Sequence, residues 1–182
     1  MLKIITLFAA AALLTAAAAS ASESRPGNAT SKPGRIIIDG VPFVKQKDKY
    51  CGPAAMASVM QFYGRDVGQD EIAEAVYTPG IDGALISDME NYARAEGYET
   101  EAVNGSEESL TALIDEGVPA ILLVDMGKWK VSVPHYYVVY GYDASKKTFI
   151  LHTGDKGGQE ITFEELDGEW KKMNRLVLVI RK

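Results

Sequence analysis

The stretch that decides the fold is "VPFVKQKDKYCGPAAMASVM", Val41 to Met60, which joins an extended lead-in to a helical pattern. It contains Cys51, the only cysteine among the 182 residues. Pro42 keeps the residue before it extended, and the residues after the cysteine have helical spacing up to Gly64, a fitting helix end. The sequence therefore predicts that Cys51 lies at the N-terminus of the first strong helix.

This position gives the cysteine a chemical use. A helix N-terminus carries partial positive charge and free N–H groups, which favour a thiolate over a thiol. Pro53 suits the first helical turn, where a missing N–H costs nothing, and Gly52 leaves space beside the sulfur. We therefore expect Cys51 to be a nucleophile that needs a base. A buried, inert thiol is the alternative.

Two histidines are present, and either is a candidate base. His135 begins the strand-like segment "HYYVVYGYD", where a strand start near a loop can reach a cleft, so it is the preferred candidate. His152 lies within the next strand-like segment and fits an ordinary strand residue. Gln46, five residues before Cys51, carries a side-chain amide that can stabilise a developing oxyanion beside the Cys51 backbone N–H.

The start of the chain has the pattern of a targeting segment rather than of a fold. Residues 1–21 contain an almost entirely apolar run, Ile4 to Ala19, followed by a small-residue cleavage site, so they are predicted to be a signal peptide. The run is short for a membrane span. Residues 22–35 are rich in Ser, Pro and Gly and are predicted to be a disordered lead-in. We therefore expect an exported protein, periplasmic or secreted, with one domain over residues 36–182.

Helical patterns come first along this domain and strand patterns follow. After a short extended segment at 35–44, helices are predicted within 51–64, 68–80, 83–97 and 106–117. Strands are predicted within 119–125, 135–143, 148–154 and 175–180, with a short strand and a helix between 159 and 173. This order predicts an α+β fold in which N-terminal helices pack on an antiparallel sheet.

Composition excludes several kinds of partner. The formal net charge of −6 argues against nucleic acid, which needs a basic surface. No Cys/His cluster suggests a metal site and no glycine-rich loop suggests a phosphate site, so we expect no cofactor and no metal. Trp129 and Trp170 are expected to pack in the core. The domain is expected to be a monomer.

Two motifs together resemble those of a known family. Gln-x4-Cys-Gly-Pro-Ala-Ala from Gln46 and His-Tyr-x-Val-Val-x-Gly-Tyr-Asp from His135 are similar to motifs of the C39 family of papain-like cysteine peptidases and its stand-alone C39-like relatives. The resemblance covers most of residues 36–180. It implies a papain-like fold, a nucleophile at Cys51, a base at His135, an oxyanion donor at Gln46 and a peptide or protein substrate. Many members cut a leader peptide after a Gly-Gly pair and are fused to an ABC exporter, so an export system is a further implied partner.

The sequence departs from the family at the residue that orients the histidine. The family has an Asp, often followed by Pro, at the end of the returning strand, whereas this chain reads "ILHTGD". Asp143 lies roughly 26 Å from His135 along one strand, which is too far for a hydrogen bond. If Asp143 pairs with Thr148, the hairpin places His135 near Asp155 and Lys156, so Asp155 is the preferred orienter.

Other solutions to this departure stay open, and so do other functions. His152 is the second candidate for the orienting role, and a Cys–His dyad helped by Thr153, a backbone group or water is the third. The preferred function is a cysteine peptidase that uses a Cys–His thiolate. One alternative is a catalytically inactive C39-like module that binds peptides, motivated by the missing Asp. The other is a thiol acyltransferase that uses the same pair of residues.

Overall fold

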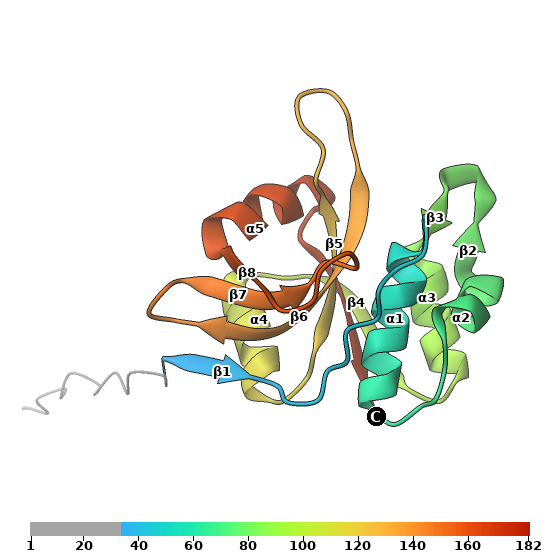
Figure 1. Cartoon of the computed structure of the whole chain (residues 1–182), viewed down its shortest axis with the longest axis horizontal. Coiled ribbons are helices and arrows are strands. Elements are labelled where there is room, and N and C mark those ends of the chain that lie inside the picture. The colour runs from blue at the N-terminus through green and yellow to red at the C-terminus, as the bar shows by residue number, and fades with distance from the viewer. Residues whose placement is uncertain (1–33) are drawn as a thin grey trace, which may run out of the picture. The chain divides into compact units, whose positions relative to one another are not determined.

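A seven-stranded antiparallel sheet organises residues 34–182, the part of the chain that this computed structural model describes. The strand order is β4-β9-β5-β6-β7-β8, and β1 pairs with β6 (Figure 1). The strands of this sheet are β1 (Arg35–Ile37), β4 (Glu99–Asn104), β5 (Ala120–Asp125), β6 (Pro134–Asp143), β7 (Thr148–His152), β8 (Gln159–Thr162) and β9 (Leu176–Arg181). A separate hairpin is formed by β2 (Tyr77–Thr78) and β3 (Gly83–Ala84).

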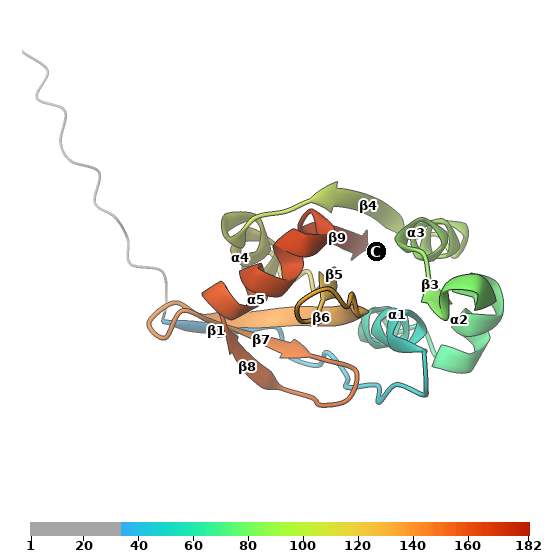
Figure 2. The same cartoon turned by 90° about the horizontal axis from the view of Figure 1, so that it is seen from above.

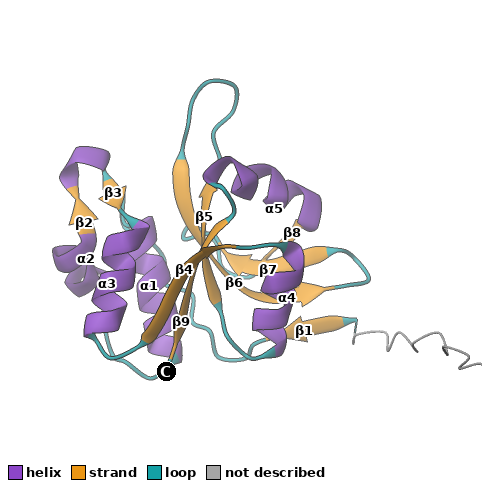
Figure 3. Cartoon of the chain, turned by 180° about the vertical axis from the view of Figure 1, so that it is seen from behind, coloured by secondary structure: helices purple, strands orange, loops and turns teal. Residues whose placement is uncertain are grey.

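Helices cover both faces of the sheet. They are α1 (Cys51–Phe62), α2 (Gln69–Val76), α3 (Ile86–Ala95), α4 (Glu107–Asp115) and α5 (Phe163–Trp170), with short 3₁₀ turns η1 (Pro79–Ile81) and η2 (Lys171–Met173). One buried apolar cluster joins α1, α2 and α3 to the sheet, and a second joins α4 and α5 to it. Figures 2 and 3 show the first three helices grouped on one side and the other two apart from them.

The alternation of side chains along β6 divides the core in this way. Tyr136 and Val138 belong to the cluster with α1, whereas Tyr137 and Val139 belong to the cluster with α4 and α5. Successive residues of a strand face opposite sides of the sheet. Because both faces are covered, the strand reads as a continuous run of apolar and aromatic residues rather than as an alternating one.

The predicted α+β, papain-like architecture is confirmed, and the predicted helices are present. The helix predicted from Ser106 has that residue as its N-cap, where its side chain accepts a hydrogen bond from the Ser109 N–H. Sequence patterns missed β4, because this edge strand of sequence "ETEAVN" carries the charges that protect a sheet edge. The predicted signal peptide, residues 1–21, lies outside the described residues. Arg35, assigned to the lead-in, is the first residue of β1, where its guanidinium pairs with Glu160.

Helix α1 is buried along most of its length, and this fixes the position of Cys51. Every residue from Gly52 to Met60 is buried, and several of them are alanines, which let the helix approach the sheet closely. The hydroxyl of Ser58 donates to the Pro42 carbonyl at 2.6 Å and ties the helix to the preceding extended chain. At the N-terminus Gly52 faces Ala84 of β3, so the cysteine sits where α1, β3 and the sheet meet.

Gly52 is expected to be required for this packing. A Cβ at this position would lie 3.0 Å from Ala84 Cβ and 3.1 Å from Met89 Sδ. Overpacking of this kind costs about 1–3 kcal/mol, against which the better helix propensity of alanine offsets about 1 kcal/mol. Gly52→Ala should therefore lower the free energy of unfolding in urea by a net amount of up to about 2 kcal/mol. Gly68→Ala is the control, because no atom lies within 4 Å of its Cβ position. Equal stability of the two variants would contradict this account.

Candidate active site

Cys51 is the first residue of α1, as predicted. No side chain caps this helix end, and its first turn contains no acidic residue. The first intrahelical bond of the turn runs from the Ala54 N–H to the Tyr50 carbonyl at 2.8 Å. The helix therefore presents N–H groups and partial positive charge at the cysteine, with no carboxylate on the same turn to oppose a thiolate. The cysteine side chain is half-buried.

His135 lies against Cys51, so the structure brings the predicted nucleophile and base together. The two side chains are close enough to interact, and Cys51 raises the pKa of the His135 imidazole. On the other side of the ring, Nε2 lies 2.6 Å from the backbone carbonyl oxygen of Thr153. A carbonyl only accepts, so Nε2 carries the proton of that bond and Nδ1 is the nitrogen left to exchange a proton with the thiol.

The surroundings of His135 favour its charged form. Burial by itself lowers the pKa of this imidazole. The hydrogen bond and the negative charge of Cys51 raise it, and so do the Thr153 carbonyl and the charge of Asp155. The result is a pKa above the ordinary value of 6.5. The side chain of Cys51, the Thr153 carbonyl and Asp155 therefore all favour a proton on this imidazole.

The carbonyl that holds His135 belongs to a tight turn after β7. Thr153 donates its backbone N–H to the Lys156 carbonyl at 3.0 Å, and Lys156 donates its N–H to the Thr153 hydroxyl at 3.1 Å. Gly154, between them, has a φ of +83°, which glycine adopts without strain. These bonds fix the direction of the Thr153 carbonyl. The hydrogen-bond partner of the His135 ring is therefore a backbone oxygen, which the sequence left open as one of the alternatives.

Gln46 is held beside the same turn. Its backbone N–H donates to the Gly154 carbonyl at 2.9 Å. Gln69 of α2 bonds both neighbours of Gln46, accepting from the Lys47 N–H and donating to the Lys45 carbonyl, each at 2.8 Å. Within residues 34–182, Gln46 Oε1 is buried without a hydrogen-bond partner. The lead-in loop is thus fixed around Gln46, and its side-chain amide packs against the turn that holds His135.

Asp155 is near His135 but does not provide the orienting hydrogen bond. Its charge contributes to the raised pKa of His135, whereas the ring nitrogen bonds to Thr153. The Asp155 side chain is exposed, where water and salt weaken its electrostatic effect. The expected pairing of Asp143 with Thr148 is present, but a bulge between Val139 and Gly141 shifts the later pairs by one residue.

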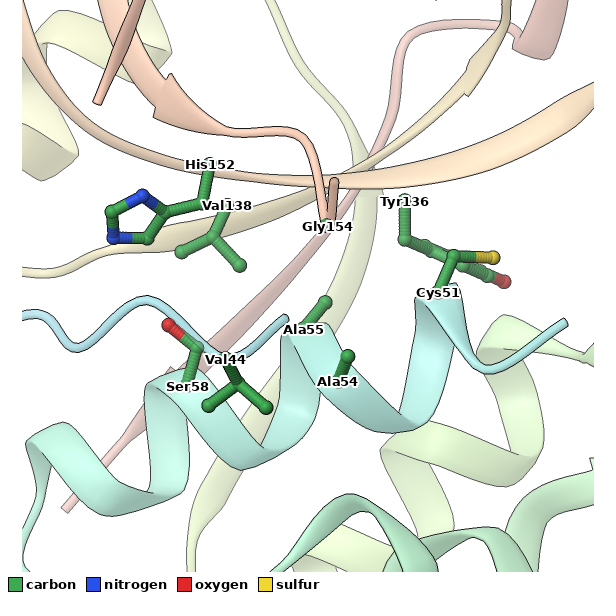
Figure 4. A pocket seen from close by; sticks show the side chains of 9 residues that line it. All are labelled: Val44, Cys51, Ala54, Ala55, Ser58, Tyr136, Val138, His152 and Gly154. Carbon is green, nitrogen blue, oxygen red and sulfur yellow. The ribbon is translucent and has the colours of Figure 1, made fainter. Parts of the chain in front are cut away.

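His152, the other orienter candidate, is not part of the Cys51–His135 pair. Its Nδ1 accepts from the Gly158 N–H at 3.1 Å, so Nε2 carries the proton and donates to the Val41 carbonyl at 3.2 Å. Figure 4 shows its ring at the opposite end of the view from the Cys51 sulfur and pointing away from it. The residue is buried, and it ties the lead-in chain to the sheet.

Two cavities flank the pair, one on each side. A cavity of about 370 Å³ is lined by Cys51 and by residues of β3 and the start of α3. A second cavity, of about 340 Å³, is lined by His135, Thr153 and Asp155.

In residues 34–182 there is no cluster of three or more His, Cys, Asp or Glu side chains suited to a metal ion. None of the described helices is both long and apolar enough to cross a membrane.

Comparisons with known proteins identify the family and the fold. The sequence profile of the "Peptidase_C39 like family" matches residues 38–178. The peptidase domain of Streptococcus ComA, a bifunctional ABC transporter involved in a quorum sensing pathway, is 27% identical with a TM-score of 0.65. That alignment covers 78% of this chain and 98% of the ComA domain. The comparison with curated proteins gave no significant match.

Two more distant structures share the fold. A double glycine motif protease from an AMS/PCAT transporter, solved in complex with its leader peptide, is 22% identical with a TM-score of 0.62 over 80% of this chain and 96% of the protease. Xylellain, a cysteine protease from Xylella fastidiosa, is 13% identical with a TM-score of 0.59 over 82% of this chain and 86% of its own.

The turn at Gly154 is expected to be essential for the site. An alanine Cβ there would overlap Gln46 Oε1, and the positive φ is strained for any residue with a side chain. Gly154→Ala should therefore slow the alkylation of Cys51 at neutral pH by about tenfold, because the Thr153 carbonyl no longer holds His135. Gly97→Ala, with a φ of +90° but open space, is the control for backbone strain alone. An unchanged alkylation rate in Gly154→Ala would contradict the role of the turn.

His152 should affect stability and not reactivity. Burial lowers its pKa below 6.5, although the Val41 bond raises it, so the unfolded chain binds the proton more tightly. Acid therefore favours unfolding: the protein should lose stability as pH falls from about 6.5 through the folded-state pKa. Removing the buried hydrogen bonds in His152→Leu should cost about 1–3 kcal/mol at pH 7.5 and abolish this part of the pH dependence, as measured by urea unfolding. A changed pH profile of Cys51 alkylation would contradict the structural role.

Proposed function

The chain belongs to the Peptidase_C39 like family, and we propose that it is a cysteine peptidase in which Cys51 and His135 hydrolyse a peptide bond. The observation that carries this proposal is the two-sided contact of His135, with Cys51 on one side and the Thr153 carbonyl at 2.6 Å on the other. A general base must reach the proton it takes and must be held in orientation, and His135 meets both conditions.

The proposed reaction has two stages. The Cys51 thiolate attacks the carbonyl carbon, and the resulting oxyanion is stabilised by the Cys51 backbone N–H and the Gln46 side-chain amide. The C–N bond then breaks, and the His135 imidazolium gives its proton to the leaving amine. In the second stage His135 takes a proton from water, whose oxygen attacks the thioester carbon. The C–S bond breaks, and the acid and the Cys51–His135 pair are released.

The backbone carbonyl of Thr153 replaces a carboxylate in this scheme. It accepts the hydrogen bond from the His135 Nε2–H and so leaves Nδ1 to face the Cys51 sulfur, which is the orienting role that a carboxylate would otherwise have. A carbonyl carries only partial charge, but the bond is short and the ring is buried. This argues against the inactive peptide-binding alternative, which rested on the missing Asp. The thiol acyltransferase alternative uses the same pair and differs only in whether an amine or water accepts the acyl group.

We further propose that the enzyme works outside the cytoplasm, in the periplasm or as a secreted protein. The support is the signal-peptide pattern of residues 1–21. The substrate class is a peptide or a protein, and delivery by a separate export system is part of the proposal. The comparison domain from Streptococcus ComA is part of an ABC transporter. A monomer is sufficient for the chemistry, because all the proposed catalytic groups come from one chain.

The pH dependence of Cys51 alkylation by iodoacetamide tests the pair. The wild-type protein should react at pH 6.5 at a rate within a fewfold of that at pH 9, because the imidazolium stabilises the reactive thiolate. His135→Ala should react at pH 6.5 at least about tenfold more slowly, as a free thiol does. Asp155→Asn should change the alkylation rate of Cys51 little, because the Asp155 side chain is exposed and its charge is screened by water. If Cys51 alkylation shows the pH dependence of an ordinary thiol in both the wild type and His135→Ala, the result would contradict the peptidase proposal. It would support the alternative of an inactive peptide-binding module with a peptidase fold.

A further inference from the structure

The loop between β5 and β6, residues 126–133, carries an apolar patch that faces solvent. The Trp129 side chain is fully exposed, and Val131 and Val133 are 66% and 42% exposed. Seven large apolar side chains are exposed among residues 34–182, and three of them lie within these five positions. Figure 1 shows the loop projecting beyond the strands and helices around it. Single exposed apolar residues are ordinary, whereas a contiguous patch marks an interaction surface.

Hydrogen bonds at the base hold the loop in one conformation. The Asp125 carboxylate accepts from the backbone N–H groups of Gly127 and Val133, each at 2.7 Å, and from the Ser132 hydroxyl at 2.9 Å. The Lys172 ammonium donates to the Asp125 and Gly127 carbonyls at 3.0 and 2.8 Å. An ordered loop presents the exposed side chains, which lowers the conformational entropy that is lost on binding.

Trp129 stands where the backbone favours a different residue. The tip is a β-turn from Lys128 to Val131, closed by a hydrogen bond from the Val131 N–H to the Lys128 carbonyl at 3.2 Å. Trp129 is the second residue of this turn and has a φ of +62°. Glycine or asparagine is usual there, because a bulky side chain is strained at positive φ. Neither packing nor backbone conformation explains an indole at this position, which points to a role in binding.

The tip is also positively charged. Residues 126–134 contain Lys128 and Lys130 and no acidic residue, although the whole chain has a formal net charge of −6. Both lysine side chains are exposed, and within residues 34–182 neither ammonium group forms an ion pair. The carboxylate at the base, that of Asp125, is occupied by its three hydrogen bonds. The tip therefore attracts an anionic partner.

Two other occupants fit this patch less well. Residues 127–133 line neither the 370 Å³ cavity at Cys51 nor the 340 Å³ cavity at His135, so a peptide bound in those cavities does not cover them. A stable protein interface buries about 800 Å² on each partner. Three apolar side chains on one projecting loop offer less than this, because even a buried aromatic side chain contributes only about 150–250 Å².

An anionic phospholipid surface matches both the apolar and the charged part of the tip. Tryptophan is favoured at the headgroup level of a membrane, where its ring meets apolar chains and its N–H meets water. Lysine stems lie along the apolar layer while their ammonium groups reach the phosphates. Acidic residues elsewhere in the domain repel such a surface, but the Debye length at physiological salt is about 8 Å, so distant charges are largely screened. The lysines of the tip therefore determine the attraction.

We propose that the β5–β6 loop docks this protein on an anionic phospholipid surface, with Trp129 and Val131 in the headgroup layer and Lys128 and Lys130 on the lipid phosphates. Only Pro134 separates this loop from His135 along the chain. Docking therefore holds the candidate active site beside the lipid surface. The proposal does not rest on the peptidase function, because the binding comes from the loop alone.

The first experiment uses Trp129 as its own reporter. The chain has two tryptophans and Trp170 is buried, so a change in indole emission on adding lipid reports on Trp129. Residues 1–21 are omitted, because their apolar run would itself bind lipid, and both core clusters are retained within residues 34–182. With vesicles of equal parts phosphatidylglycerol and phosphatidylcholine, the emission should shift to shorter wavelength, and tail-brominated lipid should quench it. Binding to phosphatidylcholine alone should be at least about tenfold weaker, because the lysines lose their anionic partner.

Sedimentation with the same vesicles measures the contribution of the indole. Trp129→Ala removes a fully exposed side chain, so the fold should be unaffected. The vesicle partition coefficient of this variant should fall at least about tenfold. Ile37→Ala, which removes an exposed apolar side chain of β1, is the matched control and should bind like the wild type. The alkylation rate of Cys51 should be the same in both variants, which checks that the domain is intact.

Two double variants of equal net charge test the charge of the tip. Lys128→Gln with Lys130→Gln should lower the partition coefficient on the phosphatidylglycerol vesicles about tenfold and change binding to phosphatidylcholine little. Lys146→Gln with Lys147→Gln, which alters two exposed lysines on the turn between β6 and β7, should bind like the wild type. Salt at about 0.5 M should remove most of the difference between the two double variants.

An indole emission that does not shift with the phosphatidylglycerol vesicles would overturn the proposal and leave the patch to a protein partner. Vesicle binding that Trp129→Ala does not weaken, or that both pairs of lysine substitutions weaken equally, would also overturn it, because the lipid would then be held elsewhere than on this loop. These outcomes do not bear on the peptidase function, which the pH dependence of Cys51 alkylation tests separately.

Discussion

The site depends on the burial of α1 between the sheet and the neighbouring helices. A helix that packs along nearly all of its length cannot shift or rotate without losing contacts in the interior. Its N-terminus, and with it Cys51, is therefore held in one place relative to β6. The small residues of the helix make this close packing possible, and Gly52 allows it to continue up to the cysteine. No side chain caps the first turn, so its N–H groups remain available to the thiolate and the oxyanion of the proposed mechanism.

The turn after β7 fixes the other half of the site. Thr153 and Gly154 are adjacent, and their carbonyls hold His135 and the backbone of Gln46 respectively. Any change in the conformation of this turn would move the base and the proposed oxyanion donor together. His152, one residue before Thr153, bonds to Val41 and Gly158 and ties the lead-in chain to the sheet. It therefore stabilises the fold and forms no hydrogen bond to Cys51 or His135.

Local patterns in the sequence were sufficient to predict the position of Cys51 and much of the fold. The position of Cys51 at a helix start follows from a few neighbouring residues, and the helix ends follow from capping residues such as Ser106. The orienting group could not be found in this way, because a backbone carbonyl has no residue type to mark it. The hairpin register predicted that Asp155 lies near His135. The β-bulge between Val139 and Gly141, which shifts the register by one residue, could not be predicted by counting residues along the two strands. Trp170 is buried as expected, whereas Trp129 is fully exposed on the loop between β5 and β6. The prediction that Trp129 packs in the core was therefore wrong, because it rested only on the apolar character of the side chain.

A backbone carbonyl in place of a carboxylate changes the electrostatics of the pair as well as its sequence signal. A carboxylate would stabilise the imidazolium with a full negative charge, whereas the Thr153 carbonyl supplies only a dipole. The raised pKa of His135 therefore depends more heavily on the negative charge of Cys51 itself. It follows that the imidazolium is favoured while the thiolate is free and is disfavoured once the sulfur is acylated. That order suits the proposed reaction, in which the histidine gives up its proton to the leaving amine and then acts as a neutral base toward water.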